Sequence, residues 1–157
     1  MKYIKSVVSM LCLVVAPLSM AAYPSINEAQ SCQALVDFVD IKVSKIGDRY
    51  TKNDIALIRK GLSAYSAYLQ EDVITPGLLS FYGGNAKKAK AMNKLFYRNK
   101  VTFMRHLNER YSDQKLITDY AYAINQCAKK SLPKGDTYWQ LKSSLETIIR
   151  LAKLEKA

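Results

Sequence analysis

The chain has 157 residues and a formal charge of +11 at pH 7, from 24 basic and 13 acidic side chains. Its length suits one domain with a sizeable core. The chain has one histidine and three cysteines. If two of the cysteines form a disulfide, too few imidazoles and thiolates remain to build a metal site.

Residues 1–21 have the pattern of a secretion signal peptide. Lys2 and Lys5 give it a positive start, and an apolar stretch follows over residues 7–18. Pro17 interrupts this stretch, which is also too short to cross a bilayer, since a spanning helix needs about 20 apolar residues. The pattern therefore favours a removed signal peptide over the alternative, an uncleaved anchor helix.

We expect cleavage after Ala21 or Ala22, where small residues precede the cut. The mature chain is then one helical domain over residues 22–157, exported to the bacterial periplasm or the medium, with no transmembrane span. Cys12 leaves with the signal peptide. The residues before it lack the small side chains that precede a lipid-modified cysteine, which argues against a lipoprotein.

Two cysteines, Cys32 and Cys127, remain in the mature chain. In an oxidising compartment, an even pair in a small domain predicts one structural disulfide. It would close a loop of roughly 95 residues, which the chain-entropy model values at about 4–5 kcal/mol. The alternative, a redox-active pair, lacks the Cys-x-x-Cys spacing.

A first helix is predicted to begin after Ser25 and to end near Gly47. Ser25 and Glu28 have the spacing of a capping box, in which each side chain bonds to the backbone N–H of the other residue. Apolar residues then recur every three or four positions, as on one face of a helix: Cys32, Leu35, Val39, Val43 and Ile46.

A second helix is predicted to begin after Thr51, with Asp54 three positions later. Gly61 interrupts this helix at a cost of about 1 kcal/mol relative to alanine. Close packing of the backbone against a neighbouring helix would explain the glycine. The buried stripe comprises Ile55, Ile58, Leu62, Tyr65, Leu69 and Val73.

The segment that follows is predicted to be irregular. Thr75-Pro76-Gly77 ends the second helix, residues 78–82 form a short apolar link, and two glycines break the chain again. Loops on a rigid scaffold often carry function. We interpret part of this segment either as a contact loop or as a hinge whose aromatics cap the bundle: Phe81, Tyr82, Gly83, Gly84 and Asn85.

Three more helices are predicted in the remaining chain. Asn85 caps the third helix over residues 86–110, Ser112-Asp113 starts the fourth, and Asp136 or Thr137 caps the fifth. No stretch alternates polar and apolar residues as a strand would.

The predicted helices give the cysteines a place in the fold. Cys32 lies on the apolar face of the first helix and Cys127 on that of the fourth, so a disulfide would pin the two ends of the chain across the core. The sequence therefore predicts an all-α, single-domain bundle of four to five helices stapled by one disulfide.

Basic residues concentrate on the third predicted helix. Residues 83–110 hold eight basic side chains and one acidic side chain, whereas residues 23–82 hold six and seven. At 100° per residue, five of the basic residues fall on one side of the helix, here called the basic face: Lys87, Lys90, Lys94, Arg98 and Arg105. The opposite side carries a core-facing stripe: Ala89, Met92, Phe96, Phe103 and Leu107.

Two interpretations of the basic face stay open. It is either a solvated surface that keeps the protein soluble or a contact surface for an anionic partner. In an exported protein that partner would be an acidic protein or the headgroups of phospholipid or lipopolysaccharide. Nucleic acid is a poor candidate because of the compartment, despite the charge.

Motifs for catalysis or cofactor binding are absent from the sequence. His106, the single histidine, has no methionine on another helix to complete a haem site, since both methionines outside the signal peptide lie on its own helix. No metal-ligand spacing and no strained serine turn occur. The close carboxylate pairs, Asp37 with Asp40 and Glu71 with Asp72, are typical of solvated helix surfaces. We expect no catalytic residue, no metal and no cofactor.

The sequence thus predicts a non-enzymatic interaction module of the adaptor, chaperone or toxin-immunity type, with a protein partner in the cell envelope. One alternative is an envelope-surface protein that binds anionic lipid or lipopolysaccharide through the basic face. Another is an enzyme with an unrecognised site. The choice among these three functions is based on analogy with other small exported helical proteins, which gives only a starting expectation.

Overall fold

The computed structural model describes residues 25–113 and 115–154, and the predicted signal peptide lies outside them. Every regular element in these residues is helical, which confirms the all-α prediction. The elements in chain order are α1 (Ile26–Ser44), the 3₁₀ turn η1 (Gly47–Arg49), α2 (Lys52–Tyr68), the π-helical segment η2 (Leu69–Ile74), α3 (Thr75–Phe81), α4 (Ala86–Arg110), α5 (Thr118–Lys130) and α6 (Gly135–Leu154).

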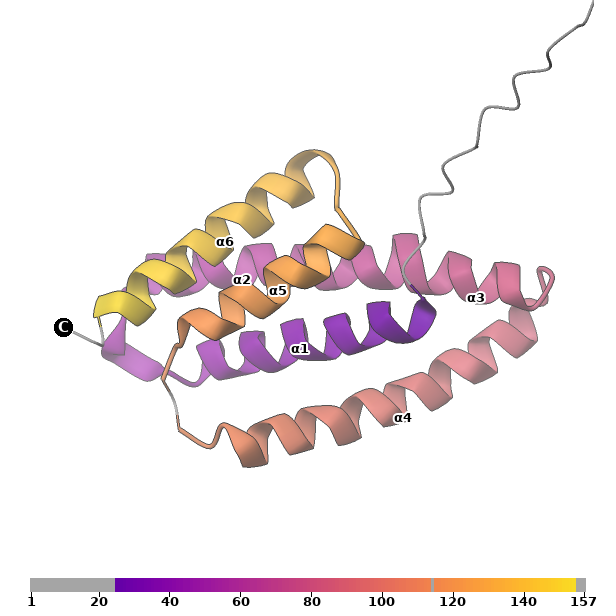
Figure 1. Ribbon diagram of the computed structural model, residues 1–157, viewed down its shortest axis with the longest axis horizontal. Coiled ribbons are helices and arrows are strands. Elements are labelled where there is room, and N and C mark those ends of the chain that lie inside the picture. The colour runs from indigo at the N-terminus through magenta and orange to yellow at the C-terminus, as the bar shows by residue number, and fades with distance from the viewer. Residues whose placement is uncertain (1–24, 114, 155–157) are drawn as a thin grey trace, which may run out of the picture.

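The elements from α2 to α3 follow one another without a break, so the described chain forms five helical rods (Figure 1). α1 lies in the middle and contacts α2, α4 and α5, while α6 packs along α2 and also touches α5. α4 lies at one edge of the bundle and α6 at the other (Figure 1). The core is formed where α1, α2, α5 and α6 bring their apolar stripes together.

Three of the predicted helix starts are confirmed by their hydrogen bonds. The Ser25 hydroxyl accepts from the Glu28 N–H at 3.2 Å, and the Glu28 carboxylate accepts from the Ser25 N–H at 3.2 Å. Thr51 accepts from the Asp54 N–H at 3.1 Å, and the Asn85 side chain accepts from the N–H three residues later at 3.0 Å. These side chains satisfy backbone donors that the first turn leaves without a partner.

The predicted end of the second helix at Thr75-Pro76-Gly77 is wrong. The Thr75 N–H donates to the Gln70 carbonyl five residues back, so one wider turn precedes the proline and the helix continues as α3. Pro76 then falls in the first turn of α3, where a missing N–H costs little. The predicted apolar link is therefore mostly helical, and Leu78 on α3 is buried in the core.

The fourth and fifth predicted helices begin elsewhere than expected. α5 starts at Thr118 rather than after Ser112-Asp113. Leu116 is buried in the core and the Asp113 carbonyl accepts from the Lys42 ammonium, and these contacts compete with a helix start at Asp113. α6 starts at Gly135, which has a φ of 57°, just before the two predicted caps.

The predicted disulfide is confirmed. The sulfur atoms of Cys32 and Cys127 are 2.04 Å apart, and the two Cα atoms are 5.6 Å apart. Cys32 is buried on α1, and Cys127 lies on α5, the fourth of the predicted helices. The bond therefore joins the first described helix to the helical pair at the C-terminal end of the chain.

Close packing of α2 against α6 explains Gly61. A Cβ atom added there would overlap the backbone carbonyl of Gln140 and lie 2.6 Å from Ser144 Cβ. At the same contact, the Ser144 hydroxyl donates to the Ile58 carbonyl at 2.7 Å. The expectation that the glycine lets two backbones approach is confirmed.

Candidate interaction surface on α4

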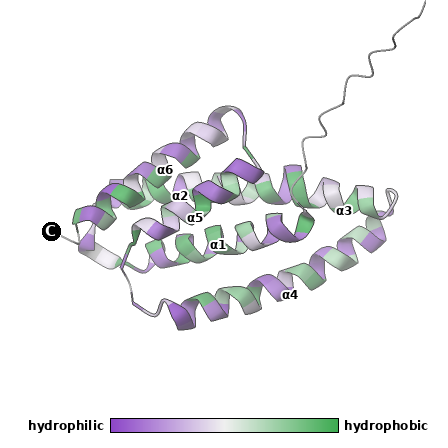
Figure 2. Cartoon of the chain, viewed as in Figure 1, coloured by the Kyte–Doolittle hydropathy of each residue, from purple (hydrophilic) through white to green (hydrophobic). Residues whose placement is uncertain are grey.

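α4 is the longest helix in the described residues and the least buried. Of its 25 residues only Ala89 is buried. The other inward side chains are half-buried against the core: Met92, Phe96, Met104 and Leu107. In Figure 2 hydrophilic positions recur along the whole length of α4. The helix therefore rests on the bundle along a narrow apolar stripe and leaves most of its surface in solvent.

Phe103 does not belong to this stripe, contrary to the prediction, and its ring is 42% exposed. α4 packs mainly on α1 and α3. A helix with so few neighbours buries fewer of its faces than a helix in the centre of a bundle. Met104, one position later, lies against the core in its place.

The inward side of α4 is held partly by polar contacts. The Lys100 ammonium lies 2.7 Å from the Asp37 carboxylate on α1, and that carboxylate also accepts from the Ser66 hydroxyl at 2.6 Å. Nearby, the Gln70 amide in η2 donates to the Asn93 side chain at 3.4 Å. Lys100 is thus used to attach α4 to the bundle and is not part of the basic face.

The five side chains of the basic face, Lys87, Lys90, Lys94, Arg98 and Arg105, are all exposed. They cover 18 residue steps of one helix, or about 27 Å. None of them forms an ion pair with another residue in the part of the chain that the structure describes.

Several cations outside the basic face have carboxylate partners, although some, such as Lys60 and Lys134, have none among the described residues. Arg59 lies 3.0 Å from Asp40, and Lys130 lies 2.7 Å from Glu28. The acidic groups of α1 and α2 are therefore largely paired within the protein, whereas the charge of the basic face stays uncompensated. Such a strip attracts anionic surfaces and speeds encounter with them.

Exposed apolar side chains lie beside these cations on α4. Tyr97 is 62% exposed and Val101 is 50% exposed. Val101 falls three positions after Arg98 and four before Arg105, so it shares their side of the helix. Tyrosine and arginine are enriched at the energetic centres of protein interfaces. The basic face therefore offers contact area as well as charge.

The predicted contact loop lies directly before the basic face. Phe81 is the last residue of α3 and is 75% exposed, and its ring meets the Tyr82 ring edge-on at 5.0 Å. Gly83 and Gly84 have φ values of 57° and 81°, which favour glycine, and Asn85 caps α4. The loop thus sets the direction in which α4 leaves α3, and its exposed aromatic ring precedes Lys87 by six residues.

The remaining chemistry of the described residues is sparse. His106 is exposed on α4, with its Nδ1 atom 3.5 Å from the Glu109 carboxylate one turn later. Within residues 25–113 and 115–154, no three His, Cys, Asp or Glu side chains are grouped so that they could hold a metal ion. None of the helices in the same ranges is long and apolar enough to cross a membrane.

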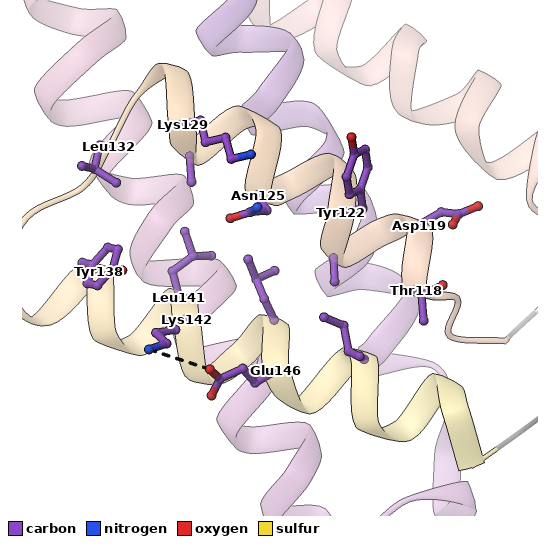
Figure 3. A pocket seen from close by; sticks show the side chains of 14 residues that line it. Thr118, Asp119, Tyr122, Asn125, Lys129, Leu132, Tyr138, Leu141, Lys142 and Glu146 are labelled. Carbon is purple, nitrogen blue, oxygen red and sulfur yellow. Dashed lines mark ion pairs between the residues drawn. The ribbon is translucent and has the colours of Figure 1, made fainter.

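Sequence reasoning missed one feature, a groove between α5 and α6 that is lined from both helices (Figure 3). The signal was present in the small residues Ala121 and Ala128, which leave room where larger side chains would fill the space between two helices. Periodicity alone marks such positions as core and does not show that the space above them is open.

No protein-family model, curated protein or solved structure matches this chain. Function is therefore inferred from the surface of the molecule itself.

Proposed function

We propose that the protein is an exported, non-enzymatic interaction module whose basic face on α4 binds an acidic protein partner in the bacterial periplasm or medium. The observation that carries this proposal is the row of five exposed cations without intramolecular partners. The Cys32–Cys127 disulfide supports the compartment, because such bonds persist in oxidising surroundings. The pattern of residues 1–21 supports export.

A binding role suits the shape of this surface. α4 presents a rod about 27 Å long from Lys87 to Arg105, which gives charge and contact area over a length that suits a macromolecular partner. The exposed Tyr97 and Val101 would supply apolar contacts at the centre of an interface. An adaptor, a chaperone or an immunity protein would use the surface in this way.

The second candidate is binding to an anionic envelope surface, either phospholipid or lipopolysaccharide. The exposed Leu95 and Val101 favour it, since apolar side chains between lysines can enter the boundary between headgroups and acyl chains. On this alternative the ligand is a surface and not a folded partner, and binding has no fixed stoichiometry.

A charge-reversal variant tests the role of the basic face. Lys90, Lys94 and Arg98 would be changed to Glu, and the matched control would change Lys60, Lys134 and Lys153 to Glu. The control residues are exposed, have no carboxylate partner among the described residues and lie off α4, so both variants change total charge equally. We expect the first variant to lose the partner recovered from periplasmic extract and the control to keep it.

Salt and vesicles separate the two candidates. Binding of a protein partner should weaken between about 50 mM and about 500 mM salt but survive with a defined stoichiometry, since apolar contacts are not screened. Binding to phosphatidylglycerol vesicles that is lost over the same range, with no stoichiometric protein recovered, would favour the envelope surface. Equal binding by wild type and both variants would leave the basic face as a solvated surface.

A further inference from the structure

The groove between α5 and α6 has a volume of about 710 Å³, and no residue of α4 lines it (Figure 3). This volume lies within the range of about 300–1,000 Å³ that is usual for small-molecule sites. The half-buried Ile149 extends a floor formed by the four buried side chains of the lining, all of which are apolar: Ala121, Ala128, Leu141 and Leu145.

The groove is elongated along α6. The lining residues on this helix extend from Tyr138 to Ile149, which is about 16 Å along a helix. A site of this length and volume suits an extended small molecule.

An extended peptide is a poor occupant. Its backbone N–H and C=O groups would lose water against an apolar floor, and each unpaired group costs free energy. The Asn125 amide is the one amide side chain among the lining residues. A chain without polar groups along its length, that is, a hydrocarbon chain, avoids this cost and gains from burial.

Charge at the rim indicates the head group. Lys129 extends along the rim near Asn125, and it forms no ion pair with any residue that the structure describes (Figure 3). The other lysine of the rim, Lys142, lies 4.0 Å from Glu146 and 5.4 Å from the centre of the Trp139 ring, so its charge is partly compensated. Asp119, at the far end, points away from the space between the helices (Figure 3).

We propose that the α5–α6 groove binds a fatty acid, with its single hydrocarbon chain on the apolar floor and its carboxylate at the Lys129 ammonium. A cationic amphiphile would place its positive head group next to the Lys129 ammonium and would therefore bind more weakly. The site is separate from the basic face, so either proposal can fail while the other holds.

Calorimetric titration with dodecanoate, below its micelle concentration, tests the groove in the oxidised protein. We expect saturable binding of one molecule per chain. Decanoate should bind about tenfold more weakly, and octanoate about tenfold more weakly again, because each buried methylene contributes to affinity. Dodecyltrimethylammonium, which has the same chain and a cationic head, should bind at least tenfold more weakly than dodecanoate.

Three variants and a matched control locate the binding. Ala128→Phe fills the floor, and Asn125→Trp covers the groove from an exposed position that the core does not use, so the second variant keeps the test valid if the first fails to fold. Both should abolish binding of dodecanoate. Lys129→Glu should weaken it about tenfold, whereas Lys134→Glu, an equal charge change outside the groove, should leave it unchanged.

Four results would overturn the proposal. One is the absence of saturable binding by dodecanoate, and another is equal affinity for the cationic amphiphile. The third is wild-type affinity in a folded Asn125→Trp variant. Loss of dodecanoate binding on charge reversal of Lys90, Lys94 and Arg98, with Lys129→Glu unaffected, would also overturn it, because the carboxylate would then be bound on α4.

Discussion

The α2–α6 contact and the α1–α4 contact hold two helices against the bundle in opposite ways. At Gly61 the α2 backbone approaches α6 so closely that no Cβ fits, and a serine hydroxyl bonds across the contact inside the core. α4 has a single buried residue, and an ion pair from Lys100 to Asp37 helps to attach it to α1. Close apolar packing supplies most of the stability of such a contact, whereas a partly exposed ion pair contributes about 1 kcal/mol or less.

This difference in packing distinguishes the helices that stabilise the fold from α4, whose outer surface is free to bind a partner. α1, α2, α5 and α6 share the core, and the disulfide ties α1 to α5. α4 contributes little to that core and keeps its outer surface unpaired. Surface substitutions away from caps and core contacts usually change stability by less than about 0.5 kcal/mol. Selection on binding could therefore change α4 without loss of the fold.

The largest loss of stability is expected from removing the disulfide. Replacing both Cys32 and Cys127 with Ala should lower the free energy of unfolding by about 4 kcal/mol, since the reduced chain regains the entropy of an open loop. Urea titration followed by circular dichroism would measure it. The midpoint should fall while the folded baseline keeps its helical spectrum. An unchanged midpoint would mean that α1 and α5 are held together by packing alone.

Gly61→Ala should give the next largest effect, and it reverses the usual sign. In an ordinary helix this change stabilises by about 1 kcal/mol. Here the added methyl group overlaps the Gln140 carbonyl, so α2 and α6 must separate, at an expected cost of about 2–3 kcal/mol. The control is Ser63→Ala, an exposed position on the same helix, which should be neutral or slightly stabilising. A raised melting temperature in Gly61→Ala would contradict the close approach.

The sequence predicted the close approach at Gly61 because a glycine inside a periodic apolar stripe weakens its own helix unless a neighbouring backbone needs the space. It likewise predicted three helix starts, since each depends on residues three positions apart. The sequence prediction failed at Pro76, because the π-helical segment Leu69–Ile74 just before the proline lets the helix continue through it. It failed at Asp113 because the competing contact comes from Lys42, far away in sequence.

The basic face and the α5–α6 groove also differ in how far the sequence alone predicts them. The five cations of the basic face could be grouped from helical periodicity alone, because they lie on one helix. The groove between α5 and α6 depends on how two helices pair and on the open space above Ala121 and Ala128. The two alanines indicate room between the helices, but the sequence of either helix alone does not show that the room stays open. Phe103 was misplaced for a related reason, since the number of neighbours around α4 is a property of the assembled bundle.

Two buried tyrosines predict how stability depends on alkaline pH. Burial raises the pKa of Tyr120 to about 12, and burial also raises the pKa of Tyr65 on α2. A group whose pKa is higher in the folded chain stabilises it fully below the unfolded value of about 10 and loses that contribution as pH rises toward the folded value. We expect the free energy of unfolding to fall by about 2 kcal/mol for each tyrosine between about pH 10 and pH 12.

Two measurements check this window. Phenolate absorbance should show late ionisation that coincides with unfolding, and Tyr120→Phe should reduce the loss above pH 10. Tyr120→Phe should also cost little at neutral pH, because the Tyr120 hydroxyl is buried without a hydrogen-bond partner among the described residues. Stability that stays constant up to pH 12 would show that both rings ionise without opening the core.

The smallest expected effect on stability distinguishes the inward side of α4 from its basic face. Lys100→Gln removes the ammonium from Asp37 and leaves the half-buried carboxylate with the Ser66 hydroxyl as its remaining partner among the described residues, so we expect a loss of about 1 kcal/mol. Lys94→Gln makes the same chemical change six residues earlier on the basic face and should alter stability by less than about 0.3 kcal/mol. Urea titration of the two variants gives the comparison directly.

The binding assay should rank the two variants in reverse. Lys94→Gln should weaken binding of the partner, and Lys100→Gln should leave that binding nearly unchanged. Equal losses of stability would mean that the solvent-facing cations also hold α4 in place, and the separation between folding and binding surfaces would not hold.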